Sequence, residues 1–387
     1  MRWGRWGRWG VGGAVVAAAL VVSGCGSSTG AGSTTSAAAS SNAGSGTSTS
    51  AAGGGAAGAS GSSTSSSAAA AAPELVGTGT GGLVVYNAQH ENLTQAWAEA
   101  FTQETGIPVE MRNGSDTELA NQLAAEGSGS PADVFLTENS PGMNIVENAG
   151  LFAPVDAATV AHVPTSFNPS TGNWVGIAAR STVFVYNPSS VAAADLPKSI
   201  MDLQDPAWQG KWAASPSGAD FQAIVSAILQ TKGADATSGW LDAMKTNASV
   251  YRGNTTVMKA VNAGEIPSGV IYHYYWYGDQ ARTGENSNNT KLLYWSGGDP
   301  GAFVSVSGGG VLASSTKQQQ AQEFLKFITG PQGQQIVADT VFEYPIGSDV
   351  PANPALTPLG ELQPPTIDPA SLNGPQVTDL MTQAGLL

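Results

Sequence analysis

Apolar and polar positions alternate along the chain with two periods, and the first part of the folded region shows both. Residues 83–87 (LVVYN), 107–111 (IPVEM) and 132–138 (ADVFLTE) are short apolar runs, which favour β-strands. Between them, residues 92–104 and 116–126 carry apolar side chains at a four-residue spacing, which predicts two amphipathic helices. Strands that alternate with helices are typical of a parallel sheet with crossover helices.

The rest of the chain continues this pattern without an internal repeat. About 310 residues follow from Pro73 onward, which is enough for two lobes. We predict two α/β lobes, with the chain crossing between them near 180–184 and 302–306. In such sheets, ligand sites lie beyond the carboxyl ends of strands. The further strands are expected at 174–180, 182–187, 268–272, 291–295 and 302–314, and the further helices at 219–231, 236–246 and 317–329.

The N-terminal 25 residues are typical of an export signal. Three arginines precede an apolar stretch that ends at Val22 and is shorter than the ~20 residues of a membrane span. The sequence Val22-Ser23-Gly24-Cys25 resembles the lipobox of bacterial lipoproteins, in which the cysteine is lipidated. We therefore predict a signal peptide at 1–24 and a lipid anchor on Cys25; the alternative is a plain secretory signal. Cys25 is the only cysteine, so neither an internal disulfide nor a cysteine metal cluster is expected.

A low-complexity segment follows the signal. Residues 26–72 consist of Ser, Gly, Ala and Thr apart from Asn42, and such a composition buries too little apolar surface to offset the entropy of ordering. We predict that 25–77 is a disordered tether that holds an exported domain at the outer face of the cytoplasmic membrane. Loss of the three signal arginines changes the formal net charge from −14 to −17. This acidity argues against nucleic-acid binding.

Four side chains are candidates for a metal site. His90 follows the strand at 83–87, Glu138 closes the strand at 132–138, and Tyr274 and Tyr275 follow the strand near 268–272. Adjacent residues at a strand end that enters a helix lie about 100° apart, so both phenols can reach one point. A phenol loses its proton at neutral pH only beside a strong Lewis acid. One imidazole, one carboxylate and two phenols therefore favour Fe(III) over Zn(II) or Ca(II).

Each of these residues also has an ordinary structural interpretation. The Tyr-Tyr-Trp run is typical of a core or of a stacking surface for sugars, His90 of a hydrogen-bonded structural histidine, and Glu138 of a helix cap. His162 and His273 are taken as structural. The chain carries no nucleophile elbow, no H-E-x-x-H and no P-loop, which argues against an enzyme. A secreted hydrolase that uses Ser217 is the alternative from another functional class.

The chain resembles the ferric-iron-binding proteins of bacterial ABC importers, sometimes called bacterial transferrins. The resemblance runs from about Leu83 to Ile346 and places His90 in VVYNAQHENLTQAWAEAFTQETGIPVEMRNG and Glu138 in GSPADVFLTEN. It places Tyr274 and Tyr275 in NAGEIPSGVIYHYYW, and it extends to PGAFVSVSGGGVLASS and EYPI (343–346). The resemblance implies that His90, Glu138, Tyr274 and Tyr275 bind iron.

The resemblance also implies a fold and a partner. The family has the two-lobed, class II periplasmic binding protein fold, in which each lobe is a mixed sheet flanked by helices and two crossover strands join the lobes. We assign 78–182 plus 303–350 to lobe 1 and 183–302 plus 351–387 to lobe 2. The expected function is extracytoplasmic capture of Fe(III) by a monomer, with delivery to an ABC permease.

In this family a small anion, phosphate or carbonate, completes the coordination of iron. The matching residues here are Ser217-Gly218-Ala219, which open a predicted helix suited to anions, together with Asn254. Asn139 stands where the family often has glutamine, and Tyr272 where it often has asparagine. Arg180 is either a bidentate partner of the anion or one half of a structural ion pair. Within the same fold, the alternative to iron is an organic cation, a sugar or a chelated iron complex.

Overall fold

A computed structural model of the chain describes residues 81–387. The predicted signal peptide, the predicted tether and Cys25 therefore lie outside the described residues. The strands are β1 (Leu83–Asn87), β2 (Val109–Asn113), β3 (Val134–Leu136), β4 (Phe152–Ala153), β5 (Val175–Tyr186), β6 (Trp212–Ala214), β7 (Ala248–Val250), β8 (Ser268–Tyr272), β9 (Lys291–Leu293), β10 (Val304–Leu312) and β11 (Tyr344–Pro345). The α-helices are α1 (Glu91–Thr105), α2 (Asp116–Glu126), α3 (Ser140–Asn148), α4 (Ala157–Val160), α5 (Ala219–Lys232), α6 (Ala234–Asn247), α7 (Asn254–Ala263), α8 (His273–Arg282), α9 (Gln318–Thr329), α10 (Pro331–Thr340) and α11 (Gly374–Gln383).

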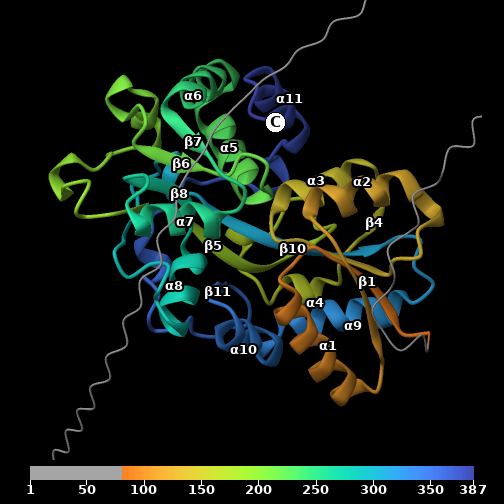
Figure 1. The fold of residues 1–387 in the computed structure, drawn as a ribbon. Helices are drawn as coiled ribbons and strands as arrows, with labels where there is room; N and C mark the ends of the chain where they lie inside the picture. The colour runs from red at the N-terminus through yellow and green to blue at the C-terminus, as the bar shows by residue number, and fades with distance from the viewer. Residues whose placement is uncertain (1–80) are drawn as a thin grey trace, which may run out of the picture. The chain divides into compact units, whose positions relative to one another are not determined.

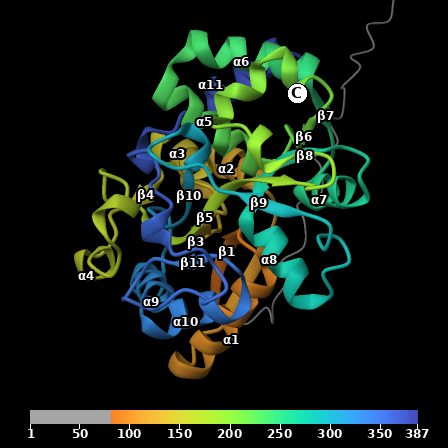
Figure 2. The same ribbon diagram turned by 90° about the vertical axis from the view of Figure 1, so that its left-hand side faces the viewer.

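The strands form two mixed groups that share one strand. In the first group β1 pairs in parallel with β2 and β3, and β10 joins β3 antiparallel. In the second group β6 pairs in parallel with β7 and β8. Strand β5 belongs to both groups, because its first half pairs with β10 and β11 and its second half with β8 and β9. Figures 1 and 2 show α5, α6 and α11 at one end of this arrangement and α1, α9 and α10 at the other.

One sequence prediction about the strands is wrong. The runs at 174–180 and 182–187 were expected to be separate strands, but β5 is a single strand of 12 residues that is buried throughout. The polar residues in its middle, Arg180, Ser181 and Thr182, concealed its continuity. Each of them finds a partner in the interior, so the polar interruption costs little of the burial energy.

Each lobe has its own apolar core. Trp97, Phe101 and Phe324 lie in the core around the first group of strands, and Trp212 and Trp240 lie in the core around the second. The segment after β11 contributes to both cores. Leu356 and Leu362 pack with the first, whereas the α11 residues Val377 and Met381 pack with the second. The lobe boundaries stated above stay a prediction, and these contacts suggest that 351–362 belongs with lobe 1.

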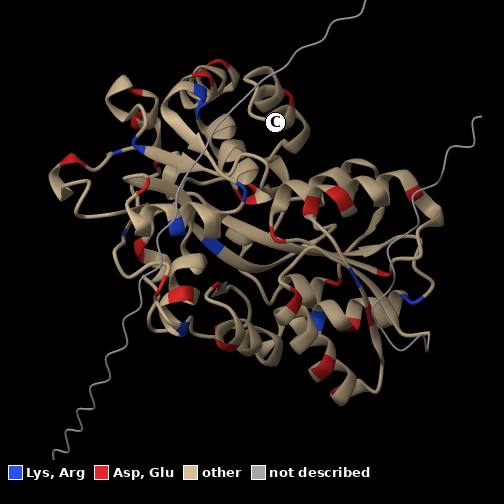
Figure 3. Ribbon diagram, viewed as in Figure 1, with Lys and Arg blue, Asp and Glu red and all other residues tan. Residues whose placement is uncertain are grey.

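Figure 3 shows acidic positions spread over helices of both lobes. Within residues 81–387, no helix is long and apolar enough to cross a membrane.

Candidate functional site

His90 lies at the carboxyl end of β1, where the chain turns into α1. It is the N-cap residue of this helix, and its backbone N–H donates to Gln89 Oε1 at 2.7 Å. The buried side chain of Asn87 supports the same turn, because its Oδ1 accepts from Gln89 N at 3.1 Å and from Thr94 Oγ1 at 2.9 Å. These contacts hold the His90 backbone at the turn between β1 and α1.

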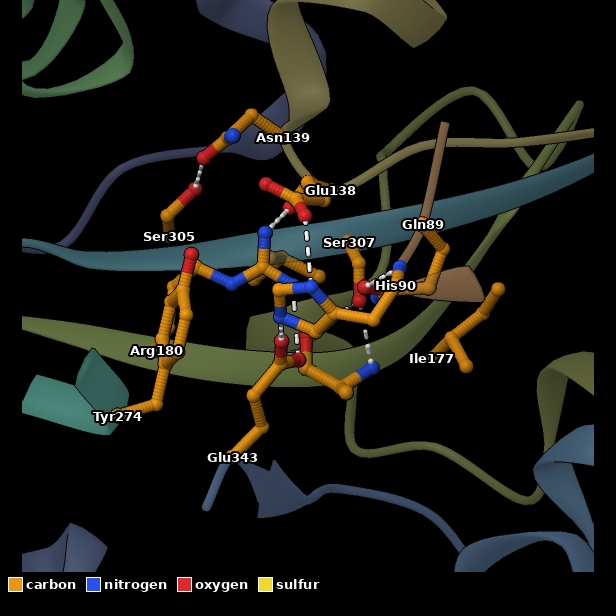
Figure 4. Close-up of polar contacts among 12 residues, drawn as sticks. Gln89, His90, Glu138, Asn139, Ile177, Arg180, Tyr274, Ser305, Ser307 and Glu343 are labelled. Carbon is orange, nitrogen blue, oxygen red and sulfur yellow. Dashed lines mark hydrogen bonds and ion pairs between the residues drawn. The ribbon is translucent and has the colours of Figure 1, made fainter. Parts of the chain in front are cut away.

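The imidazole of His90 lies between two carboxylates. Its Nδ1 is 2.9 Å from Glu138 Oε1, and its Nε2 is 2.8 Å from Glu343 Oε1 (Figure 4). The second contact is an ion pair without the alignment of a hydrogen bond. Burial lowers the pKa of His90, but the hydrogen-bonding capacity and charge of the two carboxylates outweigh burial and raise the pKa to about 10. In this state the ring is an imidazolium.

Arg180 and Glu343 form a fully buried ion pair beside His90. Arg180 Nη2 lies 2.7 Å from Glu343 Oε2, and both side chains have no exposed surface. Arg180 Nη1 also donates to the backbone carbonyl of Glu138. Burial alone would raise the pKa of Glu343, but Arg180 and His90 lower it to about 2. The carboxylate is therefore ionised and balanced by two cations.

Tyr274 and Tyr275 occupy the first turn of α8, directly after β8 ends at Tyr272. Their rings stack with centroids 4.2 Å apart. Both hydroxyls donate to the same oxygen, Asp220 Oδ2, at 3.2 Å from Tyr274 and 3.0 Å from Tyr275. Burial, followed by the charge of Asp220, raises the pKa of both phenols well above 10. Both are therefore protonated here, and their hydroxyls converge as the strand-to-helix transition predicts.

Asp220 is the centre on which the lobe 2 groups converge. It lies in the first turn of α5, and Asn254, the first residue of α7, donates to its Oδ2 at 2.7 Å. Asn139, the N-cap of α3 in lobe 1, donates to its Oδ1 at 3.0 Å. Burial is the main reason that the pKa of Asp220 is raised to about 6, with Glu138 adding to the effect. One carboxylate thus joins two asparagines and two tyrosines.

The two halves of the site meet at the rings of His90 and Tyr274. Their centroids lie 4.9 Å apart in an edge-to-face arrangement, and Arg180 lies 5.8 Å above the Tyr274 ring. Asn139 reinforces this junction, because its Oδ1 accepts from Ser305 of β10 at 2.7 Å and from Tyr272 at 3.4 Å. Groups from both lobes therefore meet in one polar cluster.

The structure brings most of the predicted residues together. Six of them belong to this cluster of contacts: His90, Glu138, Asn139, Tyr274, Tyr275 and Asn254. The predicted anion-binding turn has Ser217 exposed, Gly218 as the N-cap of α5 and Ala219 as its first residue. In this structure Asn139 and Asn254 bond to a side-chain carboxylate of the chain itself. Arg180 pairs with Glu343, and its contact with an anion stays a prediction.

Sequence reasoning missed two carboxylates, Asp220 and Glu343. Each stands beside a segment that had been noticed, since Asp220 completes S-G-A-D at 217–220 and Glu343 begins EYPI. Neither has a local pattern that identifies a ligand or a support. Within residues 81–387, no three His, Cys, Asp or Glu side chains converge as metal ligands.

Known proteins are similar to this chain over most of its described length. A family model described as a bacterial extracellular solute-binding protein matches residues 129–368. The chain is 64% identical over 307 residues to an Fe(3+)-binding periplasmic protein of Serratia marcescens, a match that covers 79% of this chain and 91% of the relative. It is 33% identical over 307 residues to a major ferric iron-binding protein of Neisseria gonorrhoeae, covering 79% and 93%. Among solved structures, iron-bound HitA from Pseudomonas aeruginosa superposes with a TM-score of 0.75 at 40% identity, covering 79% of this chain and 99% of that chain.

Proposed function

The chain belongs to the bacterial extracellular solute-binding proteins, among its ferric-iron-binding members, and from this premise we propose that it captures Fe(III) between its lobes for import. The resemblance and the two-lobed class II fold predicted from the sequence are thereby confirmed. The observation that carries the proposal is the convergence of the Tyr274 and Tyr275 hydroxyls on one carboxylate oxygen, with His90 and Glu138 beside them.

The chemistry of these groups supports Fe(III) as the cargo. Fe(III) is small and triply charged, so it favours anionic oxygen donors. Tyr274 and Tyr275 would bind as phenolates, Glu138 as a carboxylate and His90 as a neutral imidazole. Because the phenols and the His90 imidazolium are protonated in the described state, iron binding must release a proton from each of them, as metal binding to protonated ligands generally does. Ligands from both lobes would draw the lobes together on the ion.

Asp220 supports a specific version of this proposal. Sequence reasoning assigned an external phosphate or carbonate to Ser217-Gly218-Ala219, Asn139 and Asn254. Asp220 already places a carboxylate beside both tyrosine hydroxyls and both asparagines. We propose that Asp220 supplies the anionic oxygen that an external anion would otherwise provide, and that the external anion is the alternative.

A metal analysis and a visible spectrum of the purified protein test the iron proposal. We expect iron and an iron–phenolate band in the parent, and loss of the band in Tyr274→Phe and Tyr275→Phe. Tyr277→Phe is the matched control, because Tyr277 lies on the same helix and its hydroxyl pairs with Tyr294 instead of Asp220. If the parent shows neither iron nor a band, the proposal fails and a stacked organic cation or a sugar takes its place. Iron without the iron–phenolate band would instead indicate a chelated iron complex.

Removal of phosphate and carbonate tests the role of Asp220. If Asp220 supplies the oxygen, the parent retains iron without either anion. Asp220→Asn keeps an acceptor for the tyrosine hydroxyls but loses the negative charge, so this variant should release iron faster than the parent. Added phosphate should slow the release of iron from the variant again. A parent that loses iron when the anions are removed would show that an external anion is required.

Delivery to an ABC permease and anchoring by Cys25 complete the proposed function. The extracytoplasmic location fits the family, and the lipobox-like sequence ending at Cys25 supports a lipid anchor at the outer face of the cytoplasmic membrane. Cys25→Ala should release the protein into the medium or leave its signal uncleaved. Unchanged membrane fractionation and an unchanged mature mass would disprove the anchor.

Labelling of Ser217 by a fluorophosphonate would instead support the hydrolase alternative.

A further inference from the structure

Glu343 is a buried carboxylate that the proposed coordination of iron does not use. It precedes β11, which pairs with β5 through Tyr344 and Ala179, and its side chain has no exposed surface. Burying a carboxylate is unfavourable unless it is paired and hydrogen-bonded. Its two oxygens are divided between two partners, with Oε2 on Arg180 at 2.7 Å and Oε1 on His90 at 2.8 Å.

The position of Glu343 relative to the His90 ring is specific. One ring nitrogen of His90 faces Glu138, a proposed iron ligand, and the other faces Glu343 (Figure 4). A histidine that binds a metal through one nitrogen generally gives its other N–H to a carboxylate, a carbonyl or water, which fixes the orientation of the ring. Glu343 stands at the place of such an outer partner.

Arg180 explains how Glu343 remains in place. It binds Glu343 Oε2 and, through its other terminal nitrogen, the backbone carbonyl of Glu138. Arg180 is itself fixed in β5, the strand that both lobes share. The carboxylate of Glu343 is therefore held against β5, the strand that both lobes share, while His90 lies at the end of β1.

We propose that Glu343 is a positioning residue for iron capture: it holds Nε2 of His90 so that Nδ1, the nitrogen that faces Glu138, is presented to iron. The proposal rests on the proposed function, because it requires His90 to be an iron ligand. If Glu343 instead served only as the counter-ion of Arg180, its loss would destabilise the fold without changing the iron site.

Glu343→Gln tests the proposal, with Asp133→Asn as the matched control. Asp133 is a buried carboxylate of the same lobe, it pairs with Lys317 at 3.4 Å, and it bonds to Val84 N and Ser315. We measure iron release to a competing chelator, the visible band and the electron paramagnetic resonance (EPR) signal of bound Fe(III). Glu343→Gln should keep the band and release iron roughly 10–100-fold faster, the usual effect of losing an outer partner of a metal ligand. Its EPR signal should change, whereas Asp133→Asn should match the parent in all three measurements.

A double-mutant cycle with His90→Ala separates positioning from general damage. If Glu343 acts through His90, Glu343→Gln should have little effect once His90 is absent. The double variant His90→Ala/Glu343→Gln should therefore release iron at a rate within about twofold of that of His90→Ala, which is the ordinary scatter of such comparisons. The proposal is overturned if Glu343→Gln leaves release and the EPR signal unchanged, or accelerates release equally with and without His90. Should Glu343→Gln fail to fold, Glu343→Asp replaces it with the same expectations, since the shorter carboxylate cannot reach both partners. A parent without iron would instead refute the proposed function.

Discussion

The buried ion pair between Arg180 and Glu343 allows a quantitative prediction of how much this contact stabilises the fold around β5, the strand that both lobes share. Two unit charges 2.7 Å apart attract each other by about 6 kcal/mol at an effective dielectric constant of ~20. Against this stands a desolvation penalty of several kcal/mol for each ion. Removing one partner loses the attraction while the remaining charge keeps its penalty, and such changes typically cost about 3–5 kcal/mol.

We therefore expect Arg180→Met to lower the free energy of unfolding of the iron-free protein by about 3 kcal/mol. The lower end of the range applies because Glu343 keeps a second cationic partner, His90, at 2.8 Å. At ~2 °C per kcal/mol for a chain of this size, the melting temperature should fall by roughly 6 °C. The double variant Arg180→Met/Glu343→Leu removes both charges, so it should recover much of the loss.

Urea unfolding of the iron-free proteins, followed by tryptophan fluorescence, measures these values. Iron must be removed first, because a ligand that binds only the folded state adds its own stabilisation. The reasoning is refuted if Arg180→Met costs less than about 1 kcal/mol, or if the double variant is less stable than Arg180→Met by a further 3 kcal/mol or more.

Three further predictions concern single contacts. Gly310→Ala should destabilise by about 1–3 kcal/mol, because the added Cβ would lie 2.4 Å from the Phe152 ring; an unchanged melting temperature would contradict this. Trp97→Phe should cost about 1–3 kcal/mol, since it removes the indole N–H that donates to the Gly333 carbonyl and shortens a fully buried side chain, and urea unfolding measures the loss. Burial raises the pKa of Asp279, but the hydrogen bonds that Ser287 and Asn286 donate to its carboxylate outweigh burial and lower the pKa. A lowered pKa stabilises the folded state above the unfolded pKa of ~3.9 and loses this effect as the pH falls. Asp279→Asn should therefore lower the melting temperature at pH 7, and a difference from the parent that does not shrink below about pH 4 would disprove this assignment.

The local pattern of the sequence determined the elements and where the candidate residues stand on them. Strand and helix alternation depends on periods of two and 3.6 residues, which short segments encode by themselves. This is why β1, β8 and the start of α8 lie where they were expected, and why the adjacent tyrosines could be predicted to converge. His90 and Glu138 were placed by the same argument, because ligands gather at the carboxyl ends of strands.

Only the tertiary structure decided which charged groups meet. Tyr274 and Asp220 are 54 residues apart, and Arg180 and Glu343 are 163 residues apart, so no local period relates them. Arg180 interrupts an apolar run, and this pattern predicts the end of a strand. Arg180 is instead buried within β5, because the carboxylate of Glu343 neutralises its charge. Whether a buried charge is tolerated depends on its partners in space, and folding alone brings those partners together.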